Sequence, residues 1–271
     1  MTPQLWHALW TALACNGLLA FSVWIVSLWR TDASLIDRFW PVFFGLQTLL
    51  YGAATWGQRG LAAWRWWGVA LAVSLWALRL GFHITRRNWG HGEDRRYQAI
   101  RGRHQAHYAW KSLVMVFGLQ ALLAWLLALP VAAALSGARA FGFLDFAGLL
   151  VAGCGLCLEV LADQQLQRFR ARPDNAHRVL DQGLWRYSRH PNYFGEACFW
   201  WGIGLLAWGS WGMTAVPLLL APALMTYLLR RVSGVDLLEQ DIAERRPGYL
   251  AYMRNTPPFV PGRPGKWSSS P

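Results

Sequence analysis

The sequence predicts an all-α, polytopic integral membrane protein with seven transmembrane helices, and three observations lead to this fold class. Apolar residues make up 55% of the 271 residues, which is more than the core of a soluble protein requires. Apolar runs of about 18 or more residues, the length that crosses a bilayer, recur along the whole chain. Basic residues are concentrated in alternate loops, a bias typical of membrane proteins.

Each predicted span is an apolar run whose ends are marked by polar or aromatic residues. The first run lacks a basic leader and a small-residue cleavage site, so we interpret it as a retained helix and not as a signal peptide. Trp64, Trp67 and Trp211 are among the tryptophans at the ends of runs, where indole rings favour the headgroup layer. In chain order the seven predicted spans are Ala8 to Trp29, Trp40 to Trp56, Trp66 to His83, Lys111 to Leu135, Phe143 to Leu161, Tyr193 to Trp208 and Trp211 to Leu229.

The distribution of positive charge predicts the orientation of these spans. Of the 26 lysines and arginines, only Arg59, Arg65 and Arg139 fall on one side, and the other 23 fall on the opposite side. Short, positively charged loops stay in the cytoplasm, so the C-terminus is predicted to be cytoplasmic and the N-terminus to be outside. Topology and anionic lipid therefore explain the net charge of +12, and we expect no nucleic-acid partner.

The cysteines give no sign of a metal site. All four fall inside predicted spans, where a thiol behaves as a small apolar side chain. Cys154 and Cys157 form a CxxC, but a zinc site needs two more ligands at matching spacing, and none is nearby. The chain also lacks a GxGxxG turn and a Walker loop, so a nucleotide would need a different kind of site.

The most informative stretch is GLWRYSRHPNYFGE, residues 183–196, at the start of a predicted span. Ionisable residues at the mouth of a membrane helix are costly and mark a functional site. Arg186 and Arg189 alone are also explained as topology residues. That explanation leaves out Asn192 and Glu196, which are one helical turn apart and put an amide and a carboxylate on one face.

Two further segments add polar chemistry on the predicted cytoplasmic side. One runs from Arg79 to Tyr108 and carries far more polar residues than a connector needs. In the other, Glu159, Asp163, Gln167 and Arg170 follow helical spacing along one face as a span emerges into water. Gln167 is equally explained as part of a solvated helix end. Glu159 and Asp163 lie close to or within the apolar run, where we expect carboxylates to have partners.

These residues carry a resemblance to a known family. Residues 159–196 resemble the C-terminal domain of the steroid 5-alpha-reductase family, in which an Asp and an Arg at this spacing precede an Asn-aromatic-x-Gly-Glu element. Over nearly the whole chain the sequence is similar to the DUF1295 proteins, bacterial relatives of unknown function. The shared motifs are Asp37 with Trp40, RRNWGHGEDRRY, Asp163 with Arg170, SRHPNYFGE and the closing RRPGYLAYMRNTPPFVP.

The resemblance implies a membrane reductase that holds NADPH between its spans and its cytoplasmic loops. It would reduce a carbon–carbon double bond conjugated to a carbonyl in a steroid-like or other lipophilic substrate. Arginines would pair with the phosphates, Asn192 with the nicotinamide carboxamide, and Asp163 with adenosine-side hydroxyls or an arginine. The implied cofactor-binding residues are Glu159, Asp163, Arg170, Arg186, Tyr187, Arg189, His190, Asn192, Tyr193 and Glu196.

The same resemblance implies a single membrane domain over residues 1–271. Residues 1–110 would form the N-terminal helices and the first cytoplasmic loop, residues 111–262 the reductase-like part, and residues 263–271 a disordered tail. The expected location is a bacterial inner membrane, with membrane lipid around the spans and the active site facing the cytoplasm.

The expected catalytic residues depart from the steroid reductases. In those enzymes a carboxylate near the start of the second helix and a tyrosine in the third are implied to bind the substrate carbonyl. Asp37 fits the first role. The predicted third span contains no tyrosine, which leaves His83 near its end as a candidate acid, although a lone histidine there is more often a structural hydrogen-bonder. A fatty, terpenoid or polyketide enone therefore suits the site as well as a steroid.

Two other functions stay open. The motif RHPNYFG, residues 189–195, also resembles the isoprenylcysteine carboxyl methyltransferases, which bind S-adenosylmethionine. Those enzymes carry adjacent glutamates after their last span, whereas Asp236, Glu239 and Asp241 are separated here, and Asn192 fits the reductase pattern better. A lipid-binding or structural membrane protein with basic loops is the third possibility, and it leaves the intramembrane carboxylates unexplained.

Overall fold

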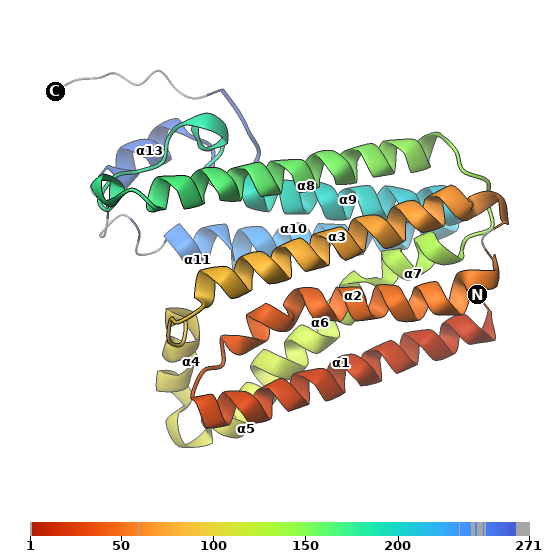
Figure 1. Cartoon of the computed structure of the whole chain (residues 1–271), viewed down its shortest axis with the longest axis horizontal. Coiled ribbons are helices and arrows are strands. Elements are labelled where there is room, and N and C mark those ends of the chain that lie inside the picture. The colour runs from red at the N-terminus through yellow and green to blue at the C-terminus, as the bar shows by residue number, and fades with distance from the viewer. Residues whose placement is uncertain are drawn as a thin grey trace. The chain divides into compact units, whose positions relative to one another are not determined.

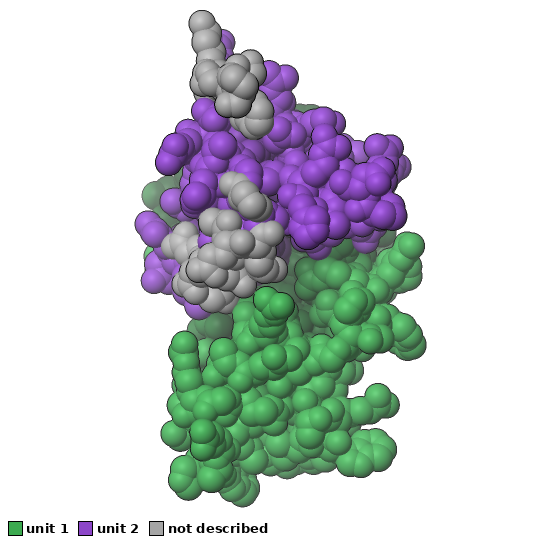
Figure 2. All heavy atoms as spheres, turned by 90° about the vertical axis from the view of Figure 1, so that its left-hand side faces the viewer, with its two compact units in different colours: residues 1–146, 206–221 green, residues 147–205, 222–271 purple. Residues whose placement is uncertain are grey.

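The structure is a computed structural model of the chain, and it describes residues 2–58, 60–232, 234–239, 242, 246 and 248–263. Over these residues the chain is helical and contains no strand. Arg59, Asp241 and residues 264–271, which form most of the predicted tail, lie outside the described residues. The chain divides into two compact units, coloured in Figure 2: Met1–Phe146 with Leu206–Ala221, and Ala147–Leu205 with Pro222–Pro271. The predicted division after residue 110 stays a prediction.

The first unit is built around α2 (Leu35–Thr55). This helix packs against α1 (Pro3–Arg30) and α3 (Ala63–Asn88), and it also contacts α6 (Leu119–Leu127) and α7 (Leu129–Ser136) (Figure 1). The connecting elements are η1 (Trp56–Gln58), η2 (Gly60–Ala62), α4 (Arg95–His104), η3 (Gln105–His107), α5 (Tyr108–Ser112), the π-helical η4 (Leu113–Gly118) and η7 (Gly212–Leu219).

The core of this unit combines large apolar side chains with satisfied polar ones. Phe43, Phe44 and Tyr51 of α2 are fully buried. Gln47 is buried among them, donates to the carbonyls of Phe43 and Ala124 at 3.1 and 3.2 Å, and accepts from the Tyr51 hydroxyl at 3.0 Å. A buried amide is tolerated when its hydrogen bonds are made inside the protein. Polar contacts as well as packing therefore hold α2 in the bundle.

Five helices among the described residues are long and apolar enough to cross a membrane. The chain is thus an all-helical integral membrane protein, while the predicted number of seven spans and the orientation of the termini stay predictions. The predicted span from Trp40 to Trp56 lies in α2, which is not among the five, because polar residues lower its hydropathy. The candidate spans are Pro3–Arg30, Gly60–Asn88, Arg95–Ser136, Phe143–Arg170 and Pro191–Val232.

The last candidate span is a helical hairpin. Trp201 Nε1 in α9 (Pro191–Trp211) donates to Thr226 Oγ1 in α10 (Leu220–Tyr227) at 3.1 Å. In one straight helix these two residues would be about 38 Å apart, at a rise of 1.5 Å per residue. The chain therefore reverses between them, and Gly212 lies there with a φ of +66°, a conformation that favours glycine. The reversal separates two of the predicted runs, Tyr193 to Trp208 and Trp211 to Leu229.

The second unit is built on the crossing of α8 (Phe143–Arg170) with α9. A Cβ on Gly155 would lie 2.5 Å from the Gly195 carbonyl oxygen, and a Cβ on Gly202 would lie 2.5 Å from the Ala152 nitrogen. The two backbones therefore touch, as they do where small residues line helix pairs in membranes. The remaining elements of the unit are η5 (Pro173–Asn175), η6 (Gly183–Arg186), η8 (Leu228–Val232), α11 (Val235–Glu239) and α13 (Tyr249–Asn255).

A small apolar core fixes the loop that leads from α8 to α9. Trp185 packs against Ala162 and Leu180, and its Nε1 donates to the Ala162 carbonyl at 3.0 Å. The Leu184 nitrogen donates to Gln165 Oε1 at 3.0 Å. These contacts tie the loop to α8 immediately before the polar motif of residues 186–196.

Candidate functional site

The predicted cofactor-binding residues all lie in the second unit, and two of them join its crossing helices. Asn192, the second residue of α9, donates from Nδ2 to Asp163 Oδ1 of α8 at 3.0 Å. Asp163 is 6% exposed. The other atom of the amide, Asn192 Oδ1, is buried and accepts no hydrogen bond from the described residues. The amide is thus held by Asp163, while its oxygen is left without a donor among the described residues.

Glu159 and Glu196 are buried beside the same crossing, at 2% and 7% exposure. A Cβ on Gly195 would lie 2.7 Å from the Glu159 nitrogen, so the glycine brings these two stretches of backbone together. Both residues interact with other groups of the protein, and acids within an apolar span are expected to have partners. Tyr193, next along α9, stacks on the His190 ring with the two ring centroids 5.7 Å apart.

Arg189 is saturated by groups of the protein itself. Its Nε and Nη2 donate to the two oxygens of Glu239 at 2.7 and 2.8 Å. Its Nη1 donates to the carbonyls of Met253 and Thr256 at 2.9 and 2.6 Å. Such a bidentate pair, with further hydrogen bonds to main-chain oxygens, fixes geometry strongly. The contact joins the start of α9 to the segment that ends at α13.

Glu239 is the centre of a cluster of four residues, which we call the Glu239 cluster: Arg189, His190, Glu239 and Tyr249. His190 Nε2 and the Tyr249 hydroxyl lie 2.9 and 3.2 Å from Glu239 Oε1. Burial alone would raise the pKa of Glu239, but the hydrogen bonds from His190 and Arg189 outweigh it and lower the pKa to about 2. Burial and the neighbouring carboxylate raise the pKa of Tyr249. Glu239 is therefore an anion and Tyr249 a neutral donor at neutral pH.

Glu239 was not predicted as a site residue from the sequence, where it is one of several separated acids after the last predicted span. The signal in the sequence was weak, because the acid follows the two arginines of η8 and reads as an ordinary charged helix end. Its partners Arg189 and His190 are 50 and 49 residues earlier in the chain, and no local pattern joins them.

Further contacts lock the same loop against the C-terminal segment. Ser188 Oγ donates to the Phe259 carbonyl at 2.7 Å, and the Tyr252 hydroxyl donates to the Trp185 carbonyl. Ser188 is fully buried. The SRHP part of the motif, residues 188–191, therefore holds the loop against the C-terminal segment and is also a candidate binding element.

The remaining predicted cofactor residues face solvent. Arg170 ends α8, and Arg186 and Tyr187 lie in or just after η6, all three exposed. The arginines thus fall into two groups. The donors of Arg189 are bound by groups of the protein, whereas Arg170 and Arg186 are exposed. Within the ranges that the structure describes, no group of three or more His, Cys, Asp or Glu residues is placed to hold a metal.

Asp37 lies in the first turn of α2 and is bound by two residues of α4. The Tyr97 hydroxyl donates to Asp37 Oδ1 at 2.5 Å, and Arg96 Nη2 donates to Asp37 Oδ2 at 3.0 Å. Gln120 Nε2 donates to the Tyr97 oxygen at 3.2 Å. Asp94 caps α4 by accepting from the Arg96 nitrogen at 2.9 Å, which fixes the turn that carries Arg96 and Tyr97. We call Asp37, Arg96, Tyr97 and Gln120 the Asp37 cluster.

Tyr97 is the functional candidate that the sequence analysis missed in the first unit. The search for a tyrosine covered the predicted third span only, and Tyr97 lies beyond it, at the end of RRNWGHGEDRRY. The motif RRNWGHGEDRRY was the sequence feature that could have identified Tyr97 as a candidate. His83, the residue predicted in its place, is half-buried in α3. The structure pairs Asp37 with a tyrosine from α4.

The chain is similar to known proteins over most of its length. An uncharacterized protein of Schizosaccharomyces pombe is 28% identical over 92% of this chain and 78% of its own length. The steroid 5-alpha-reductase DET2 of Gossypium hirsutum is 35% identical over 65 residues, which cover 24% of this chain and 25% of the reductase. No solved structure matches the chain significantly. The family described as protein of unknown function DUF1295 matches residues 23–256, and the chain therefore belongs to the DUF1295 family.

Proposed function

We propose that this protein is an NADPH-dependent membrane reductase that acts on a carbon–carbon double bond conjugated to a carbonyl in a lipophilic substrate. The observation that carries the proposal is the Asn192 amide, held by Asp163 with its Oδ1 buried and without a donor. A buried acceptor left without a donor costs free energy, and a ligand N–H removes that cost. The carboxamide of a nicotinamide offers such an N–H. The partial similarity to a steroid 5-alpha-reductase supports the reaction class.

The exposed arginines are assigned to the phosphates of the cofactor. Arg170, at the end of α8, and Arg186, six residues before Asn192, are both exposed, and guanidinium groups bind phosphate as bidentate donors. Arg189 is assigned a positioning role, because Glu239 and two carbonyls already occupy its donors. Its function here is to hold the loop that carries Arg186 and Asn192.

The Asp37 cluster is assigned to the substrate carbonyl. NADPH, when bound, supplies a hydride to the carbon β to that carbonyl. The Tyr97 hydroxyl, which donates to Asp37 in the structure, would turn its single proton from Asp37 to the carbonyl oxygen and stabilise the negative charge that develops there. Burial raises the pKa of Asp37, and Arg96, 3.0 Å away, opposes this by favouring the carboxylate. A proton from water then completes the reduction at the α carbon.

The first experiment measures thermal stabilisation of the detergent-purified protein by NADPH, NADH and S-adenosylmethionine at equal concentrations. A ligand that binds only the folded state raises its apparent melting temperature. We expect NADPH to stabilise most, and consumption of NADPH in the presence of a lipophilic enone. Stabilisation by S-adenosylmethionine alone would overturn the reductase assignment in favour of a methyltransferase. Reaction in inside-out but not right-side-out vesicles tests the proposed cytoplasmic site.

A further inference from the structure

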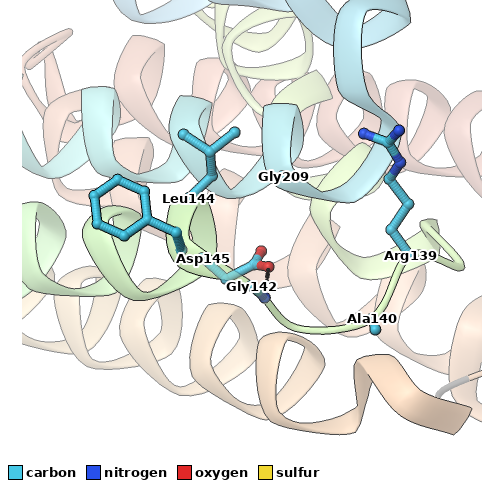
Figure 3. A pocket seen from close by; sticks show the side chains of 7 residues that line it. Arg139, Ala140, Gly142, Leu144, Asp145 and Gly209 are labelled. Atoms are coloured by element: carbon cyan, nitrogen blue, oxygen red, sulfur yellow. Dashed lines mark hydrogen bonds between the residues drawn. The ribbon is translucent and has the colours of Figure 1, made fainter.

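A hollow of about 440 Å³ opens in the first unit where the chain passes from α7 into α8. It has no part in the proposed reaction. Figure 3 shows the side chains of Arg139 and Asp145 in its wall, close to Gly209; Arg139 lies on the connection before α8 and Asp145 on the first turn of α8. The lining residues are Arg139, Ala140, Gly142, Phe143, Leu144, Asp145 and Gly209.

One of the two charges in this wall is already neutralised. Arg65 of α3 is fully buried and forms a bidentate pair with Asp145, with Nη2 and Oδ2 2.9 Å apart. The sequence analysis counted Arg65 only as a topology residue. Arg65 also donates to the carbonyls of Arg139 and Ala140 at 3.0 and 3.1 Å. The charges of Arg65 and Asp145 therefore neutralise each other, and Arg65 also holds the backbone of the loop in place.

The other charge is uncompensated. The Arg139 side chain is exposed and contacts no carboxylate among the described residues. It lies directly on Gly212, where a Cβ would be 2.3 Å from Arg139 Nη1. Gly212 has a φ of +66°, so the turn and the absence of a side chain together make room for the guanidinium. The sum of Arg65, Asp145 and Arg139 leaves the hollow with one net positive charge.

The surroundings of the hollow suit the surface layer of a membrane. The candidate span Arg95–Ser136 ends just before Arg139, and the candidate span Phe143–Arg170 begins just after it. Phe143 and Met213 are 83% and 73% exposed, which leaves an apolar rim beside the guanidinium. A ligand at this level meets a cation and apolar side chains together, as a lipid does at the boundary between headgroup and acyl chain.

We infer that this hollow binds the phosphodiester of a membrane phospholipid, with the phosphate on Arg139 and the acyl chains against the apolar rim that includes Phe143. The single negative charge of a phosphodiester matches the single uncompensated positive charge. Guanidinium groups bind phosphate oxygens through paired donors. Because Arg65 already fixes the loop, little conformational entropy of the loop is lost when the lipid binds.

Native mass spectrometry of the detergent-purified protein, titrated with phosphatidylglycerol, tests this inference. We expect the tightest-bound lipid to dissociate about tenfold more readily from Arg139→Gln than from wild type, as loss of a charge-assisted phosphate contact predicts. Arg30→Gln is the matched control, because Arg30 is an exposed arginine at the end of α1. We expect it to bind the lipid as wild type does.

Two further ligands show whether the site binds the phosphate of a lipid or that of a soluble compound. Diacylglycerol lacks a phosphate and should bind equally to wild type and to Arg139→Gln. Glycerol 3-phosphate lacks acyl chains and should bind far more weakly than phosphatidylglycerol. Equal lipid binding by wild type and Arg139→Gln would overturn the inference, and so would glycerol 3-phosphate binding as tightly as the lipid. Circular dichroism of both variants checks that the helical fold is retained.

Discussion

Arg189 binds both carboxylate oxygens of Glu239, at 2.7 and 2.8 Å, across 50 residues of sequence. The two side chains are only 8% and 10% exposed, so solvent screens the pair little. The contact gives the SRHPNYFGE motif two tasks. Asn192 carries a buried amide oxygen without a donor among the described residues, while Arg189 fixes the loop before α9 against the segment that contains α13.

Replacing Glu239 with glutamine should destabilise this joint. Glu239→Gln keeps the shape of the side chain but leaves Arg189 as a nearly buried cation without its anion, which costs about 3 kcal/mol in comparable pairs. We expect a lower apparent melting temperature and faster proteolytic release of the C-terminal segment. Asp174→Asn is the control, because Asp174 is an exposed carboxylate of the same unit, and it should melt as wild type does. Equal behaviour of the two variants would show that the ion pair contributes little.

The same joint should weaken in acid. Because the pKa of Glu239 is lowered from 4.5 to about 2 in the folded protein, the unfolded state binds the proton more tightly. The stabilisation is therefore complete above about pH 4.5 and is lost as the pH falls from 4.5 to about 2. Pepsin cleavage across this range measures it. Wild type should become more susceptible as the pH falls, and the difference between wild type and Glu239→Gln should shrink to nothing at the acid end.

Hydrophobic patterning predicted where most helices of this fold lie, but not how they pair. The run from Phe143 to Leu161 is the apolar part of α8, and the i, i+4 spacing of Glu159 and Asp163 correctly placed both on this helix, Glu159 within the run and Asp163 just beyond it. The crossing with α9 depends on glycines 155 and 195, whose role appears only when both helices are in place. The burial of Arg65 against Asp145 is likewise a contact between distant residues, and a charge count cannot distinguish it from a loop arginine.

The residues of the candidate site also fall into those that the sequence predicted and those that it did not. Residues within one motif, such as Asn192 and Glu196, were predicted because helical spacing is a local property. Tyr97 and Glu239 were missed because their partners are 60 and 50 residues away. Whether Asp37 and His83 act in catalysis stays a prediction, and the contacts of Asp37 make Tyr97 the better candidate for the proton donor.

Removing the Asn192 amide should weaken NADPH binding. Asn192→Ala deletes the buried acceptor and the donor to Asp163, and loss of one such buried contact costs about 1–3 kcal/mol, or roughly 5-fold to 150-fold in affinity. NADPH-dependent thermal stabilisation of the variant measures the effect. Asn255→Ala is the matched control, because among the described residues the Asn255 amide donates to the Ala251 carbonyl one turn earlier on α13 and to no other group. Equal NADPH affinity in both variants would contradict the role of Asn192.

Removing the Tyr97 hydroxyl should slow turnover without affecting cofactor binding. Tyr97→Phe keeps the ring but deletes the proposed donor to the substrate carbonyl, a contribution of about 100-fold or more for a positioned acid. We expect kcat with an accepted enone to fall by that factor while NADPH affinity is unchanged. Tyr108→Phe is the control, because the buried Tyr108 hydroxyl has no hydrogen-bond partner among the described residues. A wild-type kcat in Tyr97→Phe would exclude Tyr97 as the donor.

The helix crossing that positions Asn192 gives the last prediction. A Cβ on Gly155 would meet the Gly195 oxygen and the Phe199 nitrogen, both at 2.5 Å, and neither backbone can move without shifting α9. Gly155→Ala should therefore separate the helices and destabilise the protein by about 1–3 kcal/mol, as overpacking does. Gly153→Ala adds the same methyl group on α8 with nothing within 4 Å, and should leave the melting temperature unchanged. Because Asp163 lies two turns further along α8, Gly155→Ala should also weaken NADPH binding. A variant that melts normally and binds NADPH normally would show that the glycine contact does not set the geometry of the site.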